Sequence, residues 1–365
     1  MFTVPIMFFL VIPTLILYIS KENFFRFDKI VRTDYKYLIG YAYNEDNYKY
    51  LKWVILNSKN KKEVWALGSS RVLSFREQMF DTSFYNAGYT ITSINDFIPF
   101  FQSIPEVKYP KYVIIGLDQW MFNQNLDGLD KRSLSQLWEN SFNLIPRPFA
   151  YIGVWKDLLV GKYNFSLLKT NNSTDKIGLN AIVNNKGFTN DGSMYYGNQI
   201  TKLMNNDPTA NDYQYSNTLE RIKKGKDLFK YGDSVNLNAL VELDKLLKFC
   251  SENRIQLIAF LPPFADGVYK EIATSGNYGY INDIYLKVKP MFDRYGYEIY
   301  DFSTVSSVGS SDTETLDGFH GSELTYQRLL IKILESGSIL NRVTDVNRLK
   351  LDLSKRNNTF FIYDR

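Results

Sequence analysis

Apolar residues along this chain form short runs separated by longer stretches of helical spacing. Each run ends near glycine, proline or another turn residue, and together they predict β-strands at residues 63–68, 83–88, 111–116, 255–261 and 298–302. The stretches between them predict helices over residues 70–80, 93–102, 235–252, 281–294 and 322–335. Strands that alternate with helices predict an α/β fold with a parallel sheet.

The alternation is interrupted once. Residues 120–233 mix aromatic side chains with Asn, Gly and Ser without regular spacing, so we interpret them as an insertion. The α/β domain would then comprise residues 63–119 and 234–340, followed by a C-terminal tail over 341–365. A stalk over 21–62, with a helix at 45–56, would precede it.

The N-terminal segment is apolar. Residues 2–19 carry no charge, and no A-x-A-like cleavage site follows, so residues 1–20 predict an uncleaved single-pass membrane anchor. Basic residues follow the segment at Lys21, Arg26, Lys29 and Arg32. By the positive-inside rule, these charges would keep the bulk of the chain in the cytoplasm.

Composition excludes several classes of site. The chain of 365 residues has one cysteine, Cys250, and one histidine, His320. An intramolecular disulfide is therefore impossible, and neither a His-based nor a Cys-based metal site is expected. With a net charge of +4, nucleic-acid binding would need a concentrated basic patch. The short basic stretch 221–226 has the spacing of a solvated helix face, an interpretation we favour over an anionic-ligand site.

Candidate catalytic residues follow the predicted strands. Ligands bind beyond the carboxyl ends of the strands in a doubly wound sheet, so Ser70, after the first strand, and the loop that ends at His320 would lie close together. A histidine can remove the serine proton, and a carboxylate such as Asp317 can hold the imidazole in the required tautomer. This set predicts acyl transfer without a cofactor.

These residues carry a resemblance to a known superfamily. Gly68-Ser69-Ser70 resembles the G-D-S block of SGNH hydrolases, Asp317-x-x-His320 is similar to their closing D-x-x-H block, and Gly88 matches their glycine block. The resemblance implies a flavodoxin-like three-layer α/β/α sandwich with a five-stranded, mainly parallel sheet. It also implies Ser70 as nucleophile, His320 as base and Asp317 as its orienting acid.

Two positions depart from the superfamily pattern. Ser69 stands where the superfamily usually has Asp, and Asp118 stands where the third block usually has Asn. Because an ionised carboxylate cannot donate a hydrogen bond, we expect Asp118 to pair with Arg71 instead. The oxyanion hole would then use backbone N–H groups of Ser70 or Arg71 and of Gly88, with the Asn86 side chain.

The N-terminal anchor, the G-S-S-R block and the central insertion most resemble membrane-anchored proteins that act beside membrane-bound O-acyltransferases. That group includes the D-alanyl-lipoteichoic acid transfer and alginate or exopolysaccharide O-acetylation proteins. The resemblance implies an extracytoplasmic domain, and we favour that side over the cytoplasmic side that the basic residues indicate. It also implies an acylated surface polymer as substrate and a membrane-bound O-acyltransferase as partner. Acetyl and D-alanyl groups both fit, as do transfer and hydrolysis. The alternative is an inactive scaffold or glycan-binding partner, while a metal-dependent phosphohydrolase is disfavoured.

Overall fold

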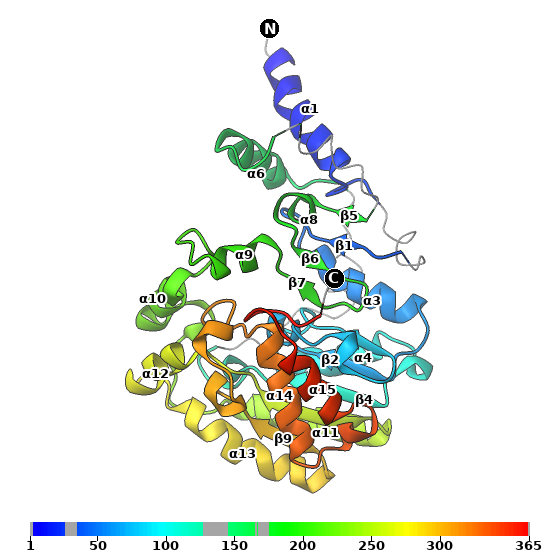
Figure 1. The fold of residues 1–365 in the computed structure, drawn as a ribbon, viewed down its shortest axis with the longest axis vertical. Helices are drawn as coiled ribbons and strands as arrows, with labels where there is room; N and C mark the ends of the chain where they lie inside the picture. The colour runs from blue at the N-terminus through cyan, green and yellow to red at the C-terminus, as the bar shows by residue number, and fades with distance from the viewer. Residues whose placement is uncertain (1–2, 26–34, 127–144, 165, 167–174, 364–365) are drawn as a thin grey trace. The chain divides into compact units, whose positions relative to one another are not determined.

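The computed structural model describes residues 3–25, 35–126, 145–164, 166 and 175–363 (Figure 1). Of the four basic residues that follow the N-terminal segment, Arg26, Lys29 and Arg32 lie outside these ranges. The chain divides into two compact units. The first comprises Met1–Lys59 and Arg132–Thr201, and the second comprises Asn60–Lys131 and Lys202–Arg365.

The second unit contains the predicted five-stranded sheet. Its strand order is β3-β2-β4-β8-β9, and every neighbouring pair is parallel. Counted along the chain this order is 2-1-3-4-5, the order of flavodoxin-like doubly wound folds. The strands are β2 (Val64–Leu67), β3 (Phe84–Asn86), β4 (Tyr112–Gly116), β8 (Gln256–Leu261) and β9 (Glu298–Asp301).

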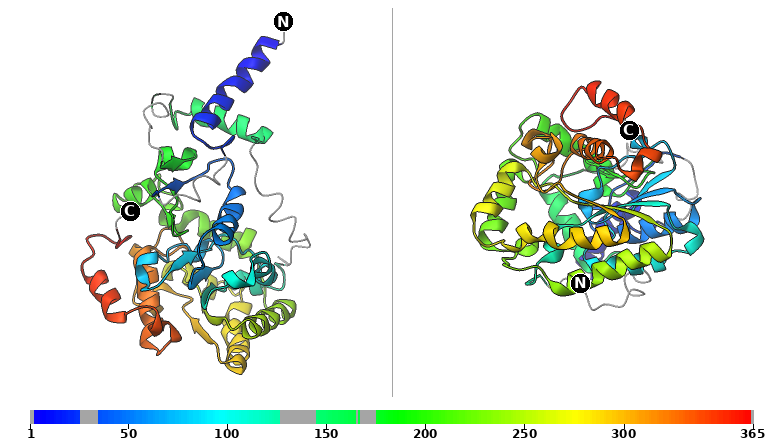
Figure 2. Two further views of the ribbon diagram at one scale, coloured as in Figure 1. Left: turned by 90° about the vertical axis from the view of Figure 1, so that its right-hand side faces the viewer. Right: turned by 90° about the horizontal axis from the view of Figure 1, so that it is seen from below.

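Alternating side chains of the strands bury the sheet on both faces, because successive residues of a strand point to opposite sides. Val64 and Ala66 of β2 belong to the core that contains Leu330 of α14 (Glu323–Glu335). Trp65, between them, stacks on Phe101 on the opposite face. In the right-hand view of Figure 2, α14 lies above the sheet and α11 (Leu237–Glu252) and α13 (Tyr280–Tyr295) lie below it, which gives three layers.

Two expectations for the second unit were wrong. No helix spans residues 70–80; the chain forms the 3-10 turns η1 (Ser70–Val72) and η2 (Glu77–Met79) instead. The Asn86 amide donates to the carbonyl oxygens of Val72 and Phe75, which a continuous helix would need for its own ladder. Residues 341–365 are not a simple tail, since α15 (Val346–Ser354) buries Leu349 in the sheet core.

The predicted insertion belongs to two different units. Residues 132–201 group with the N-terminal residues, whereas residues 202–233 group with the sheet. The second assignment follows from hydrogen bonds: the Tyr278 hydroxyl bonds the carbonyls of Ile222 and Phe229, both at 2.8 Å. Helix α10 (Ser216–Lys224) packs beside α12 (Asp266–Thr274). The sequence pattern did not predict α12.

The first unit consists of a small mixed sheet and surrounding helices. Its strand order is β5-β1-β6-β7, with β1–β5 parallel and the other two pairs antiparallel. The strands are β1 (Leu38–Ile39), β5 (Lys176–Ile177), β6 (Gly187–Phe188) and β7 (Met194–Tyr195). The helices are α1 (Thr3–Ile19), α3 (Asn47–Ser58), α6 (Pro148–Leu159) and α8 (Leu179–Asn184), while α9 (Asn198–Met204) runs from this unit into the other.

Residues 1–59 belong to one compact unit, where the sequence predicted an anchor over 1–20 and a stalk over 21–62. Ile16 and Leu17, near the end of α1, are fully buried in a core with Val154 of α6 and Leu179 of α8. Glu22, just after α1, accepts hydrogen bonds from the N–H groups of Ala42, Tyr43 and Leu179. Burial raises the pKa of Glu22 to about 7.

The predicted transmembrane helix is not found among the residues that the structure describes. Helix α1 has 17 residues, and none of the helices in the described ranges is both long and apolar enough to cross a bilayer.

Candidate functional site

The predicted site residues meet at the carboxyl edge of the parallel sheet. Ser70 follows β2 and Asp118 follows β4. Strands β2 and β4 are neighbours, but the chain goes from β2 to β3 on one side of the pair and from β4 to β8 on the other. Doubly wound sheets form their ligand crevice between two such strands. The loop from Asp317 to His320 reaches the same edge from the far end of the sequence.

Ser70 is presented by a short turn. It opens η1, and the Ser69 hydroxyl oxygen accepts a hydrogen bond from the Arg71 N–H at 3.2 Å. An N-terminal cap of this kind can be provided by Ser or by Asp. Ser69 therefore supplies a capping oxygen that an Asp at this position could also supply.

His320 is held by a closed loop. The Asp317 carboxylate accepts hydrogen bonds from the backbone N–H groups of Phe319 and His320, at 3.0 and 2.8 Å. The Leu316 N–H donates to the His320 carbonyl at 2.8 Å, and Thr315 and Gly321 form an isolated antiparallel β-bridge. These contacts orient the imidazole before any interaction with Ser70.

The three side chains form a continuous hydrogen-bonded chain. His320 Nδ1 lies 2.8 Å from Asp317 Oδ2, and His320 Nε2 lies 2.8 Å from Ser70 Oγ. Because a carboxylate only accepts, Nδ1 carries the proton and Nε2 is free to accept the serine proton. Burial alone would raise the pKa of Asp317, but the His320 ring and the two backbone N–H groups lower it below its usual value. The orienting acid is thus kept ionised.

Arg71 connects the strand ends to the histidine loop. Its buried guanidinium donates to the carbonyls of Phe319 and Pro262 at 2.9 and 2.7 Å, and to Gln119 Oε1 at 2.8 Å. The expected pair with Asp118 is present, with 3.4 Å between Nη1 and Oδ1. One residue therefore links the ends of β2, β4 and β8 to the peptide that precedes His320.

Asp118 is buried completely, which raises its pKa despite the adjacent Arg71. Its second carboxyl oxygen, Oδ2, is buried and has no hydrogen-bond partner among the described residues. The Asp118 side chain thus serves as the partner of Arg71.

Several of the predicted oxyanion-hole donors already have acceptors within the protein. The Gly88 N–H already donates to Asn86 Oδ1 at 2.9 Å, and the Asn86 amide donates to the carbonyls of Val72 and Phe75. The Gly88 N–H and the Asn86 amide therefore both have acceptors, and the Arg71 N–H donates to the Ser69 hydroxyl. Of the predicted donors, the Ser70 N–H is the one that is not seen donating to another described residue.

Several residues of the site were not identified from sequence. Gln119 and Pro262 follow strands, so their position was predictable, but nothing in the sequence indicated that they would share a buried arginine. The rings of Trp120 and Phe264 lie over the Arg71 guanidinium at 5.1 and 4.3 Å. Tyr89, directly after Gly88, has a φ of 73°, a left-handed conformation that is costly for a bulky residue.

A pocket of about 540 Å³ opens beside Asp317. Its wall includes Tyr213, Tyr215 and Phe360, together with hydroxyl and amide groups. Asp212 and Gln214, also in this wall, adopt left-handed conformations, as does Tyr215. A mixed aromatic and polar surface of this size can accommodate a sugar-like or polyol ligand.

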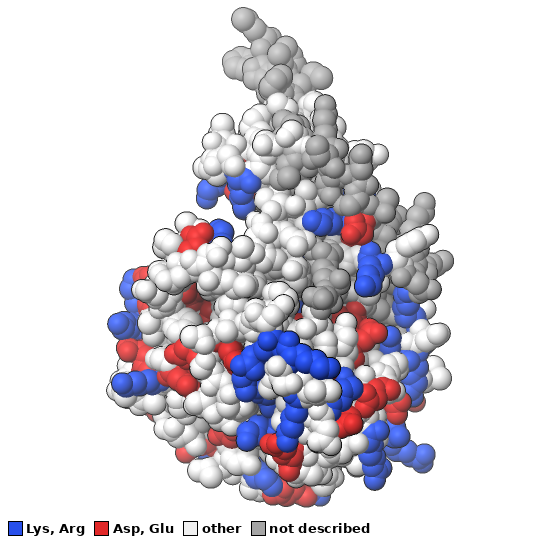
Figure 3. Space-filling view, in the orientation of Figure 1, with Lys and Arg blue, Asp and Glu red and all other residues white. Residues whose placement is uncertain are grey.

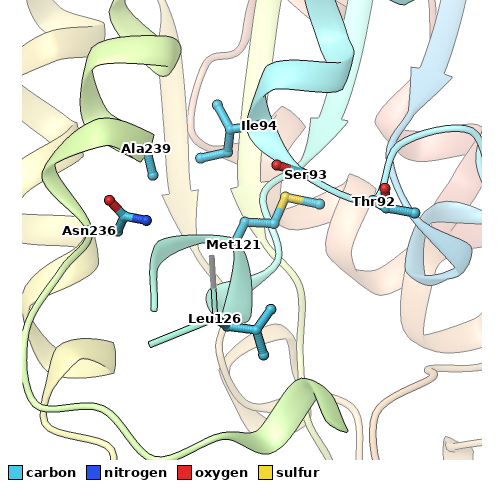
Figure 4. Close-up of a pocket in the computed structure, with 7 residues that line it drawn as sticks. All are labelled: Thr92, Ser93, Ile94, Met121, Leu126, Asn236 and Ala239. Carbon is cyan, nitrogen blue, oxygen red and sulfur yellow. The ribbon is translucent and has the colours of Figure 1, made fainter. Parts of the chain in front are cut away.

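A second pocket, shown in Figure 4, is much smaller. Met121, Ile94 and Ala239 line it with four other residues, and its volume of about 10 Å³ can hold one water molecule. None of the candidate catalytic residues belongs to it.

No protein-family model matches the chain, and no curated protein matches it significantly. Within the described ranges, no group of three or more His, Cys, Asp or Glu side chains is placed to hold a metal ion.

Proposed function

We propose that this chain is an SGNH-type serine O-acyltransferase or esterase that acts on O-acyl groups of a cell-surface polysaccharide or teichoic-type polymer. The observation that carries the proposal is the hydrogen-bonded chain from Ser70 through His320 to Asp317, with both key distances at 2.8 Å. Two further features support the proposal: the three hydrogen-bonded side chains lie at the crevice of the sheet, and a pocket opens beside Asp317.

In the proposed reaction, Ser70 Oγ attacks the acyl carbonyl while its proton passes to His320 Nε2. The tetrahedral intermediate collapses when the imidazolium returns that proton to the departing alkoxide, leaving an acyl-Ser70 ester. An acceptor hydroxyl then repeats the sequence in reverse: His320 takes its proton, its oxygen attacks the ester, and Ser70 regains a proton. If water is the acceptor, the product is the free acid.

The proposal places the domain on the outer side of the cytoplasmic membrane, beside a membrane-bound O-acyltransferase. It rests on the resemblance of the blocks around Ser70 and His320, and on the uncharged stretch over residues 2–19. Either acetyl or D-alanyl would be the transferred group.

An alternative function is a catalytically inactive scaffold or glycan-binding partner of such an acyltransferase. Two observations favour it: the N–H of Gly88 and the side-chain amide of Asn86 already donate to other groups of the protein, and Asp118 stands where SGNH hydrolases usually have Asn. Fewer donors would then remain to stabilise an oxyanion.

Labelling with a fluorophosphonate distinguishes these two functions. The parent protein is expected to be labelled at Ser70, and Ser70→Ala is expected to lose the label because the phosphonate requires an activated serine oxygen. Ser336→Ala, which removes an exposed hydroxyl at the end of α14, is the matched control and should label like the parent. A folded parent protein that takes up no label would favour the scaffold.

A further inference from the structure

Arg221 of α10 lies one aromatic ring away from the candidate catalytic base. Its guanidinium carbon is 5.2 Å from the centre of the Phe319 ring and 5.2 Å from that of Phe229. The Phe319 ring is in turn 4.3 Å from the His320 ring. Arg221 comes from the segment 202–233, and it was part of the basic stretch interpreted above as a solvated helix face.

Arg71 and Arg221 lie in the same region but differ in whether their donors have acceptors. Arg71 and Arg221 lie on different rings of a cluster formed by Trp120, Phe229, Phe264 and Phe319. Arg71 donates to four acceptors, as described above. Arg221 Nε is buried and has no hydrogen-bond partner among the described residues. A buried donor without a partner is costly, which points to an acceptor supplied from outside.

Three carboxylates near Arg221, two close to it in the sequence and one in the loop that ends at His320, already have other hydrogen-bond or ion-pair partners. Asp212 accepts from the N–H and hydroxyl of Thr218 and from the Gly318 N–H. Asp317 binds the His320 ring, and Glu220 pairs with Lys224. Figure 3 shows further basic side chains at the left edge, where α10 lies in Figure 1, and Lys223 and Lys226 are exposed.

We propose that Arg221 binds an anionic group of the substrate, a phosphodiester or a carboxylate, next to the ester that Ser70 attacks. A planar guanidinium held between rings is suited to bind two oxygens of an oxyanion at once. The inference rests on the proposed function and narrows its substrate class from any acylated surface glycan to an anionic polymer.

The test compares matched esters with and without a negative charge. We expect Arg221→Gln to lower kcat/KM for acetylated glycerol phosphate by about 10- to 100-fold, the range for a lost charge-assisted hydrogen bond. Hydrolysis of monoacetylglycerol, which lacks the phosphate, should change less than about twofold. Lys223→Gln removes the same charge from an exposed neighbour and serves as the control. Equal losses in the two variants, or no loss for Arg221→Gln, would overturn the inference.

A binding measurement separates this inference from the proposed function. In Ser70→Ala, calorimetric titration with glycerol phosphate or with glucuronate should give binding that Arg221→Gln abolishes and Lys223→Gln retains. The ligand that shows this dependence identifies the anion as phosphate or carboxylate. If neither ligand binds Ser70→Ala while the parent protein is still labelled at Ser70, the role of Arg221 is refuted and the proposed function stands.

A different observation concerns the first unit. Helix α6 exposes large apolar side chains along one face: Phe149 is 51% exposed, Ile152 63% and Leu159 80%. Their spacing of three and seven residues places them on the same side of a helix, opposite the buried Ala150 and Val154. A helix that is apolar on two sides is unusual at a water-exposed surface.

The exposed face of α6 continues onto α1. The Trp155 indole N–H donates to the Phe9 carbonyl at 2.9 Å and its ring stacks on the Phe9 ring. Phe9, Leu10, Val11 and Leu15 of α1 are also exposed by 44% to 54%. Phe9, which contacts α6 through Trp155, lies ten residues before the end of α1. A medium that surrounds the middle of α1 would therefore also reach α6.

We infer that α6 enters the headgroup and acyl-chain boundary of a lipid bilayer together with α1. An environment-sensitive dye on Ile152→Cys tests this, because Cys250 is buried and should not be labelled. The dye emission should shift to the blue when vesicles containing phosphatidylglycerol are added, and lipids carrying a nitroxide should quench it. Leu286→Cys on α13, of similar exposure at 71%, is the control and should not respond. A water-like dye at position 152 in the presence of vesicles would overturn the inference.

Discussion

His320→Ala is expected to lower the rate of fluorophosphonate labelling, and of p-nitrophenyl acetate hydrolysis, by about 10³- to 10⁴-fold. The imidazole Nε2 is the group placed 2.8 Å from Ser70 Oγ, and the chain contains no other histidine to replace it. Serine is a weak nucleophile without such a base. A reduction of less than about tenfold would show that Ser70 does not depend on His320.

Asp317→Asn should produce a comparable loss without unfolding the loop. The amide oxygen can still accept the N–H groups of Phe319 and His320, while its NH₂ would face His320 Nδ1. That arrangement requires the other tautomer, with the proton on Nε2, which then cannot take the serine proton. Matching melting curves for Asp317→Asn and the parent would separate this chemical effect from a structural one.

Replacing Arg71 should have the largest effect on stability. We expect Arg71→Met to reduce the free energy of unfolding by about 3–5 kcal/mol, as found when one member of a buried ion pair is removed. Asp118 would be left as an uncompensated buried carboxyl, and the carbonyls of Pro262 and Phe319 would lose their donor. Urea unfolding curves measure the change.

Two further variants sharpen this test. Arg294→Met removes a surface arginine paired with Asp244 and should cost less than about 1 kcal/mol. Arg71→Met combined with Asp118→Leu removes both buried charges and should recover much of the lost stability. We expect labelling of Ser70 to be reduced in Arg71→Met and in the double variant alike, because in both the Phe319 carbonyl lacks the donor that holds the histidine loop. Equal costs for Arg71→Met and Arg294→Met would contradict the linking role of Arg71.

The three central strands of the sheet were predictable because each is a short, largely apolar run. The strand expected at residues 111–116 is β4 (Tyr112–Gly116), and the one expected at 255–261 is β8 (Gln256–Leu261). Burial on both faces requires apolar side chains at nearly every position, and that requirement is visible locally. The strand ends then indicated where Ser70, Asp118 and the histidine loop would meet.

Local pattern failed where a distant residue determined the backbone. Residues 70–80 have helical spacing, but Asn86 takes two of their carbonyl oxygens. The predicted insertion has no local sign of a boundary at residue 202, because its assignment depends on bonds to Tyr278 and Gly318. Contacts between residues so far apart in the chain leave no periodicity to detect.

The sequence by itself determined the parallel sheet, the position of Ser70 after its first strand, and the spacing of Asp317 and His320, since each depends on neighbouring residues. Only the tertiary structure decided which groups these residues contact. It brought His320 to Ser70 across 250 positions and gave the Gly88 N–H and the Asn86 amide acceptors of their own. It also separated Arg71, which donates to four acceptors, from Arg221, whose Nε has no partner in the part of the chain that the structure describes. Hydrogen-bond partners depend on distances between segments, and those distances exist only once the sheet has brought the segments together.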